Sequence, residues 1–200
     1  MAIIEKPILL DAPSELTTQR LVLRIPRPGD SKFIWPAVAE SQAELAPWMP
    51  WAYPQASEQA TEEWCRRAAS SYLLREQFHY SLYLKGTDTC LGTCGTPRLN
   101  WGVPSFEIGY WLRTPYCGKG LMNEAVVAVE RMCFAQFQAA RVEIKCDERN
   151  TRSRRVAERA GYQLEAVLRH DERDPRGELR NTCVYGKLAG DISASTAPSR

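Results

Sequence analysis

Residues 106–125 read Phe-Glu-Ile-Gly-Tyr-Trp-Leu-Arg-Thr-Pro-Tyr-Cys-Gly-Lys-Gly-Leu-Met-Asn-Glu-Ala, and this stretch decides the fold. Its first part, 106–112, is rich in aromatic and branched residues and predicts a strand. A helix is expected over 120–137, because apolar residues recur there at steps of three and four and share one face. Between them, Cys117-Gly-Lys-Gly120 allows close approach of the backbone to a ligand, next to helix amides that lack internal partners. This arrangement is typical of an anion site, although Gly-Lys-Gly before a helix also serves as an ordinary turn.

Further elements are predicted on both sides of this unit. Upstream, the patterns predict strands at 20–25, 78–84 and 90–98, helices at 30–40 and 57–76 with Asp30 and Ser57 as caps, and an aromatic loop at Ala46–Pro54. Downstream, they predict a strand at 141–147, a helix at 151–160, and strands at 162–169 and 179–188 around the turn Asp174–Gly177. Three strands joined by short turns form a meander, and strands alternate with helices after it. The sequence therefore predicts an α/β (α+β) fold with a mixed, mostly antiparallel central sheet flanked by helices.

The composition of the chain narrows the function classes. Its 200 residues carry a formal net charge of +2, which does not supply the concentrated basic surface that nucleic acid or a membrane surface requires. Neither a secretory signal nor a membrane-spanning apolar run is evident. Seven scattered cysteines suit core positions in a reducing compartment better than a metal site. We expect a cytoplasmic protein without metal, with an arm at 1–15, one domain at 16–188 and a flexible tail at 189–200.

Four motifs occur in order along the chain: Glu107-Ile-Gly-Tyr-Trp-Leu112, Cys117-Gly-Lys-Gly-Leu-Met-Asn-Glu-Ala125, Asn150-Thr-Arg-Ser153 and Val156-Ala-Glu-Arg-Ala-Gly-Tyr162. Together they resemble the GNAT superfamily of acetyltransferases, and within it the RimJ/RimL-like branch that acetylates the N-termini of ribosomal proteins. The resemblance implies the GNAT fold, in which two neighbouring parallel strands, here 106–112 and 141–147, splay apart. It also implies that the pantetheine arm of acetyl-coenzyme A pairs with an open strand edge there. The pyrophosphate would then lie at the helix start.

The coenzyme contacts that the resemblance implies come largely from main-chain amides. The candidates are Trp111, Leu112, Arg113, Cys117, Gly118, Lys119, Gly120, Leu121, Met122, Asn150 and Ser153. The chain departs from the superfamily pattern at Cys117, where Gln or Arg is usual, and at Met122, where Gly or Ala is usual. An arginine cluster over 149–159 either contacts the 3′-phosphate or forms a solvated face.

Acetyl transfer to an amine requires a base, donors for the oxyanion and an acid for the departing thiolate. The ribosomal-protein branch has a Ser three residues after the Asn, which implies that Ser153 is the acid and that Asn150 orients the coenzyme. The Tyr that many GNAT enzymes use would fall at Ala157. From the residues alone, Asn150 also fits a helix cap and Ser153 a bond within the first turn.

Glu107 is the candidate base, directly or through water. Strand alternation places it with Gly109 and Trp111 on one face, beside the expected thioester, and an apolar setting would suit a carboxylate for this role. Alternatively, Glu107 is a solvated strand carboxylate without a catalytic role. Glu62 and Glu63 on the second helix are further candidates for the base. The oxyanion donor is expected among the backbone amides of 110–112.

The aromatic loop supplies Trp48, Met49, Trp51 and Tyr53, which either line an acceptor pocket or fill the core. The resemblance implies direct transfer from acetyl-coenzyme A to a primary amine, foremost a protein or peptide N-terminus, in a chain that can form a homodimer. Small amines such as an aminoglycoside or a polyamine, and a non-catalytic acyl-coenzyme A sensor, are the alternatives. Neither nucleic acid nor a membrane is an expected partner.

Overall fold

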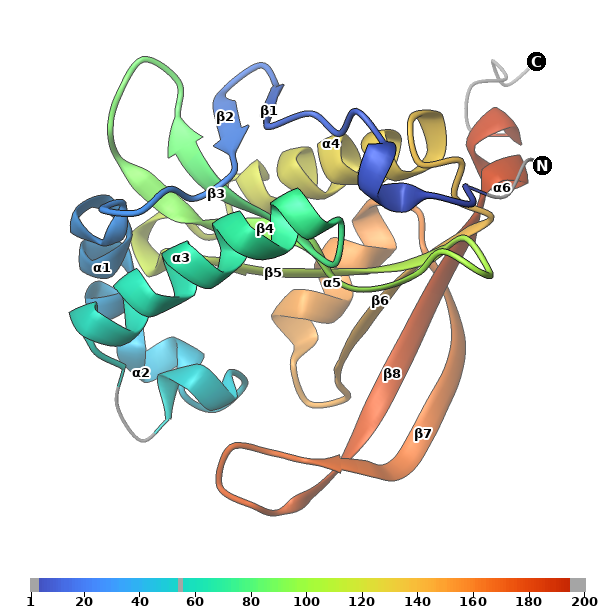
Figure 1. The fold of residues 1–200 in the computed structure, drawn as a ribbon. Coiled ribbons are helices and arrows are strands. Elements are labelled where there is room, and N and C mark those ends of the chain that lie inside the picture. The colour runs from blue at the N-terminus through green and yellow to red at the C-terminus, as the bar shows by residue number, and fades with distance from the viewer. Residues whose placement is uncertain (1–3, 54–55, 195–200) are drawn as a thin grey trace.

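The computed structural model describes residues 4–53 and 56–194, whose strands form one eight-stranded sheet in the order β1-β2-β3-β4-β5-β6-β8-β7 (Figure 1). The strands are β1 Glu15–Thr17, β2 Leu21–Arg24, β3 Phe78–Leu84, β4 Cys90–Asn100, β5 Ser105–Leu112, β6 Arg141–Asp147, β7 Gln163–Arg173 and β8 Leu179–Leu188. The α-helices are α1 Ser31–Glu40, α2 Gln42–Leu45, α3 Glu58–Leu74, α4 Leu121–Ala135, α5 Thr151–Arg159 and α6 Ala189–Ala194. Short 3-10 turns lie at Pro7–Leu9, Pro50–Ala52 and Thr114–Tyr116.

The sheet is antiparallel at every strand pair except β5–β6, so the predicted mixed, mostly antiparallel fold is confirmed. The parallel pair is joined only at its start, where residues 105–107 lie opposite residues 141–143. Beyond that point β5 stays with β4 and β6 stays with β8, and Figure 1 shows the two strands diverging. We call the opening between residues 108–112 and 144–147 the wedge. The expected splayed pair is therefore present.

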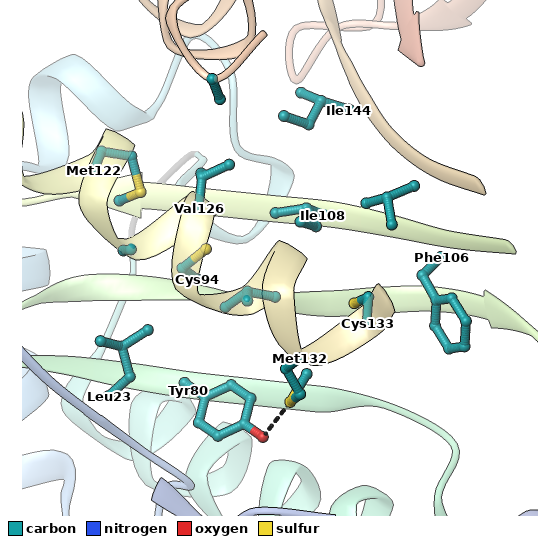
Figure 2. Packing of buried hydrophobic residues seen from close by; sticks show 14 of the residues in the cluster. Leu23, Tyr80, Cys94, Phe106, Ile108, Met122, Val126, Met132, Cys133 and Ile144 are labelled. Atoms are coloured by element: carbon teal, nitrogen blue, oxygen red, sulfur yellow. Dashed lines mark hydrogen bonds between the residues drawn. The ribbon is translucent and has the colours of Figure 1, made fainter. Parts of the chain in front are cut away.

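Helix α4 covers one face of the sheet because its apolar stripe matches the alternating apolar side chains of β3, β4 and β5. Figure 2 shows Val126 of α4 beside Ile108 and Met132 of α4 beside Tyr80, and all four side chains are buried. The Tyr80 hydroxyl also donates to the Met132 sulfur at 3.0 Å. Burying a side chain such as Val126 or Ile108 contributes about 1.5–3 kcal/mol, so this layer holds the strand–loop–helix unit in place.

The other face is covered by α1, α2 and α3, which pack around a second buried cluster that includes Tyr83, Cys90 and Trp111. Six of the seven cysteines are buried, as expected of small core residues, and Cys117 is exposed. Among the helices in the described residues, none has the length and apolar character that crossing a membrane requires.

Two helix starts on this face differ in their capping. Ser57 caps α3 as predicted, because its Oγ accepts from the Ala60 amide at 3.0 Å. Asp30 occupies the N-cap position of α1 but makes no capping bond. Its carboxylate instead accepts from Arg24 Nη1 at 2.6 Å and from the Arg27 amide at 2.7 Å, since a buried carboxylate is stabilised more by a guanidinium than by a helix amide.

The segment before β1 is attached to the domain rather than loose. Tyr72 and Tyr80 donate to the carbonyls of Ala12 and Pro13 at 2.6 and 2.7 Å, and Arg75 Nε donates to the carbonyl of Leu10. At the other end, the segment expected as a tail begins with α6, where Asp191 accepts from the Leu188 amide at 2.8 Å. Residues 1–3 and 195–200, and Pro54 of the aromatic loop, lie outside the described residues.

Candidate active site

A cavity of about 630 Å³ lies where the wedge opens onto the face covered by α1 and α3. Its walls come from α1, the aromatic loop, α3, the strands β3 to β6, the start of α5 and the tip of the β7–β8 hairpin. The predicted catalytic residues Glu107 and Ser153 line it, as do three of the predicted acceptor residues, Trp48, Met49 and Trp51. Two of the predicted coenzyme residues, Trp111 and Asn150, line it as well. Tyr53 does not line the cavity, and 43% of its surface is exposed.

The aromatic wall joins the loop to the sheet. The rings of Trp51 and Trp111 lie 5.7 Å apart, while Met49 packs against the second buried cluster. Met49 therefore lines the cavity and also fills the core, whereas Trp51, 46% exposed, lines the cavity outside the core. Trp64 of α3 also lines the cavity, edge-on to His79 with the ring centroids 5.8 Å apart.

His79 is a titratable group of the cavity that the sequence reasoning did not single out. It lies opposite Gly95 on β4, which in turn lies opposite Gly109 on β5. Burial lowers the pKa of His79 to about 4, so the imidazole is neutral at pH 7. One ring nitrogen, Nε2, lies 3.2 Å from Gln77 Oε1, which orients the ring.

Glu107 lies at the cavity wall in an ionic setting and not in the apolar one expected for it. Its carboxylate is 3.3 Å from Arg98 Nη1 and 3.5 Å from Lys145 Nζ, and 12% of its side chain is exposed. Lys145 is shared with Glu143 at 2.9 Å. Arg98 and Lys145 therefore hold the Glu107 carboxylate at the cavity wall. The rival Glu62 points elsewhere, since it accepts from the Gly29 amide and from Arg66.

Ser153 lies at the first turn of α5, on the wedge side of the cavity. Asn150 caps this helix, because its Oδ1 accepts from the Ser153 amide at 3.1 Å. The Tyr110 hydroxyl, from β5, lies 3.1 Å from Ser153 Oγ and donates to the Ser153 carbonyl at 3.0 Å. Burial raises the pKa of Cys146 to about 11, and a hydrogen bond from Ser153 acts against that rise, so the thiol is a third neighbour.

The wedge exposes backbone amides on one edge of β5. Arg113 donates its amide to the Leu91 carbonyl of β4 at 2.7 Å. Because alternate residues of an antiparallel strand face the same neighbour, Trp111 faces β4 as well, and Tyr110 and Leu112 face the wedge. The amides of Trp111 and Arg113, both expected at the coenzyme, are thus taken by the sheet. The Arg113 side chain pairs with Glu40.

The loop at the start of α4 is shaped as an anion site. Gly118 and Gly120 have φ angles of 79° and 75°, a region that glycine adopts without strain. The Cys117 amide donates to the Thr114 carbonyl at 3.1 Å. Among the described residues, no acceptor is bonded to the backbone amides from Gly118 to Asn123. These amides at a helix N-terminus form a concave donor surface, which suits an anion.

Three cations surround this loop. Lys119 lies over the Tyr116 ring at 5.1 Å, and Arg20 Nη1 donates to the Lys119 carbonyl at 3.0 Å. Partial burial raises the pKa of the Cys117 thiol, and the charge of Arg152 opposes this, so Arg152 of α5 also acts on the loop. Of the predicted arginine cluster, Arg149 instead pairs with Asp147 and Asp174.

Several site residues were missed by the sequence reasoning because they come from distant segments. Tyr110 belongs to a quoted motif, but only its backbone was considered. Lys145 and Cys146 are consecutive residues of β6, and both line the cavity. Their sequence alone does not indicate this, because the other walls come from distant segments. The hairpin tip, which contributes Glu172, Arg173 and Arg180, carries no recognisable motif.

Comparison with known proteins shows which family this chain is similar to. An uncharacterized N-acetyltransferase, p20, of Bacillus licheniformis is 31% identical over 109 residues, 54% of this chain and 61% of that protein. The ribosomal-protein-serine acetyltransferase of Escherichia coli K12 is 28% identical over 114 residues, 56% of this chain and 64% of that protein. The match therefore spans less than two thirds of either relative.

Among solved structures, Mycobacterium smegmatis RimJ in complex with a coenzyme A disulfide superposes with a TM-score of 0.78. It is 22% identical, and the superposition covers 86% of this chain and 83% of that one, a likeness of fold. Residues 20–163 match the acetyltransferase (GNAT) domain family, a range that includes the meander, the wedge, the glycine loop and α5. The chain therefore belongs to the GNAT family of acetyltransferases.

Proposed function

We propose that this protein transfers the acetyl group of acetyl-coenzyme A directly to the N-terminal amine of a protein or peptide. The observation that carries the proposal is a pair of sets of backbone amides, one on β5 and one at the start of α4, that have no protein acceptor among the described residues. The wedge-facing amides of Tyr110 and Leu112 lead to the amides of Gly118–Met122 at the start of α4. A pantetheine arm has amides that fit the first set, and a diphosphate fits the second.

The phosphate end and the thioester end of the coenzyme would lie at opposite ends of these two sets of amides. Lys119, Arg20 and Arg152 supply positive charge around the loop for phosphate groups. At the other end of the wedge, the thioester would lie near Ser153, where the cavity begins. Asn150 contributes by capping α5 and thereby fixing Ser153.

The charges of the cavity favour a peptide over a polyamine or an aminoglycoside. The charged lining consists of Arg98, Lys145, Arg173 and Arg180 against Glu107, Asp147 and Glu172. Each of these three carboxylates is already paired with a basic side chain of the chain. An acceptor with several positive charges finds no free counter-charge among these residues, whereas a single neutral amine next to peptide groups does not require one.

In this proposal Ser153 gives a proton to the departing thiolate, and the amide of Tyr110 or Leu112 donates to the developing oxyanion. Glu107 takes the proton of the attacking amine, through water, after its loose pair with Arg98 opens. The aromatic wall excludes bulk water and contacts the first side chain of the acceptor. The proposal places the protein in the cytoplasm, a reducing compartment.

The test follows thiol release from acetyl-coenzyme A with three acceptors: a lysine-free peptide, the same peptide with a blocked N-terminus, and spermidine. Thiol release with the free peptide alone, together with an acetyl group on its N-terminus by mass spectrometry, supports the proposal. Release only with spermidine would identify a small-amine enzyme. Coenzyme binding without release on any acceptor would identify a sensor.

Replacing Ser153 tests the proposed acid within this assay. Ser153→Ala is expected to lower kcat by about 10- to 100-fold while the Kd for acetyl-coenzyme A changes little. Thr151→Ala, at an exposed position in the same helical turn, is the matched control and should leave both unchanged. Equal losses of kcat and of binding in Ser153→Ala would assign Ser153 a capping role only.

A further inference from the structure

The hydroxyl of Ser153 is paired with a second hydroxyl across the wedge. Tyr110 Oη lies 3.1 Å from Ser153 Oγ, and either atom can be the donor. The phenol also donates to the Ser153 carbonyl at 3.0 Å, so it contacts the residue at two points. Tyr110 comes from β5 and Ser153 from α5, 43 residues later, which means that the fold brings the pair together.

A chemical difficulty gives this pair its significance. An alkyl thiol has a pKa near 8.5, and a phenol is a stronger acid than an aliphatic alcohol. An aliphatic hydroxyl is a far weaker acid than either, so Ser153 alone is poorly matched to protonate a thiolate. Proton donors work best when their acidity approaches that of the group they protonate. Tyr110 supplies, next to Ser153 Oγ, a hydroxyl more acidic than that of serine, so Ser153 need not be left as an alkoxide.

We propose, on the basis of the proposed function, that Tyr110 is a positioning residue that holds Ser153 and replaces its proton during thiolate departure. As the carbon–sulfur bond breaks, its electron pair goes to sulfur, and the Ser153 Oγ–H proton moves to that sulfur. The single phenol hydrogen turns from the Ser153 carbonyl to Ser153 Oγ, and this proton moves to Oγ at the same time. The proton lost by the attacking amine returns to the phenolate through solvent, so the protons balance over one turnover.

The surroundings of Tyr110 support this role. Burial raises the pKa of Tyr110, against the effect of its hydrogen bond to Ser153, so the phenol enters each turnover protonated. Its ring packs against the α4 core, which fixes the hydroxyl. The backbone of the same residue faces the wedge, so one residue would contact both the oxyanion side and the leaving-group side of the thioester.

The test is a double-mutant cycle on turnover. Tyr110→Phe keeps the ring and removes the hydroxyl, and kcat is expected to fall about tenfold or more with the KM for acetyl-coenzyme A within about twofold. In the Ser153→Ala background the same change should have no further effect, because the relay is already broken. Tyr80→Phe is the matched control, since Tyr80 is a core tyrosine of β3 that donates to the Pro13 carbonyl at 2.7 Å. Tyr80→Phe should reduce stability and leave kcat unchanged.

The outcomes separate the relay from the proposed function. Thiol release is followed with the peptide and also without it, as slow hydrolysis, because thiolate departure is common to both. Tyr110→Phe with wild-type kcat, or with losses that add to those of Ser153→Ala, overturns the relay and leaves the proposed function standing. No thiol release by the wild-type protein in either assay overturns the proposed function and the relay with it.

Discussion

Gly120 is the N-cap residue of α4 and belongs to the loop proposed to bind the diphosphate. Its φ of 75° is costly for any residue with a Cβ, by about 1–2 kcal/mol. A Cβ there would meet only Arg20 Nη2 at 3.6 Å, so the folded chain itself has room for one. A side chain at this position would therefore extend beside Arg20, one of the three cations around the loop.

Gly120→Val is expected to weaken acetyl-coenzyme A binding by about tenfold or more, because the branched side chain crowds the loop proposed to bind the diphosphate. Gly177→Val is the control, since Gly177 has a φ of 89° in the β7–β8 turn with no atom within 4 Å of a Cβ. Both variants should lose similar stability by urea unfolding, and only Gly120→Val should lose affinity by calorimetry. Comparable affinity in both would remove the loop from the coenzyme site.

Residue roles were the part of the site that the sequence predicted least completely. The motif identified Ser153 and Asn150, and the cap predicted for Asn150 is present. The expected apolar setting of Glu107 is wrong, because Arg98 and Lys145 come from neighbouring strands whose pairing is not written in any local pattern. No local pattern indicated His79 for a related reason, since apart from Gln77 its neighbours, Trp64 and Gly95, come from other elements.

At the scale of elements, β5 has two edges with different partners. Its amides at Trp111 and Arg113 face β4, and those at Tyr110 and Leu112 face the wedge. Alternate residues of one strand should therefore respond differently to the coenzyme.

Amide hydrogen exchange measured by NMR can observe this difference. In the free protein we expect fast exchange at Tyr110 and Leu112 and slow exchange at Trp111 and Arg113. Saturating coenzyme A should slow exchange at Tyr110 and Leu112 by about tenfold or more and change the other two little. Uniform protection along 110–113 would show that the arm does not pair with this edge.

Elements with strong periodicity were well predicted from the sequence. The apolar stripe of α4 and the alternation of β6 each match one buried face, so their positions followed from local pattern alone. Strand β1 was missed because Glu15–Thr17 is three residues long, too short to display a period, and pairing with β2 alone defines it. The splay of β5 from β6 was available only through the family resemblance.

For the whole molecule, stability should depend on pH through His79. Burial lowers the pKa of His79 to about 4 in the folded state, while the unfolded value is about 6.5. Between these pH values the unfolded chain binds a proton at His79 that the folded chain does not. The contribution of His79 to the free energy of unfolding is therefore full above pH 6.5 and falls as the pH drops towards 4. The loss at the acid end of this window is on the order of 3 kcal/mol.

Urea unfolding at pH 7.5 and pH 5 measures this loss. His79→Gln removes the titration and should reduce the difference between the two pH values relative to the wild type. His170→Gln, at an exposed residue of β7, should leave the wild-type difference intact. An unchanged difference in His79→Gln would assign the acid sensitivity to the paired carboxylates instead, whose lowered pKa values, as at Glu165, matter nearer pH 4.

The anchoring of Glu124 has a consequence for the electrostatics of the whole site. This carboxylate lies in the first turn of α4, where an unbalanced negative charge would repel a diphosphate. Burial would raise the pKa of Glu124, but hydrogen bonds from Thr18 and from Arg20 outweigh it and lower the pKa. A segment 104 residues upstream therefore acts as a built-in counter-ion for the loop. Shortening the chain to begin at Leu21 would keep the central strands but leave this carboxylate without Thr18 and Arg20, and would weaken the attraction of the site for a diphosphate.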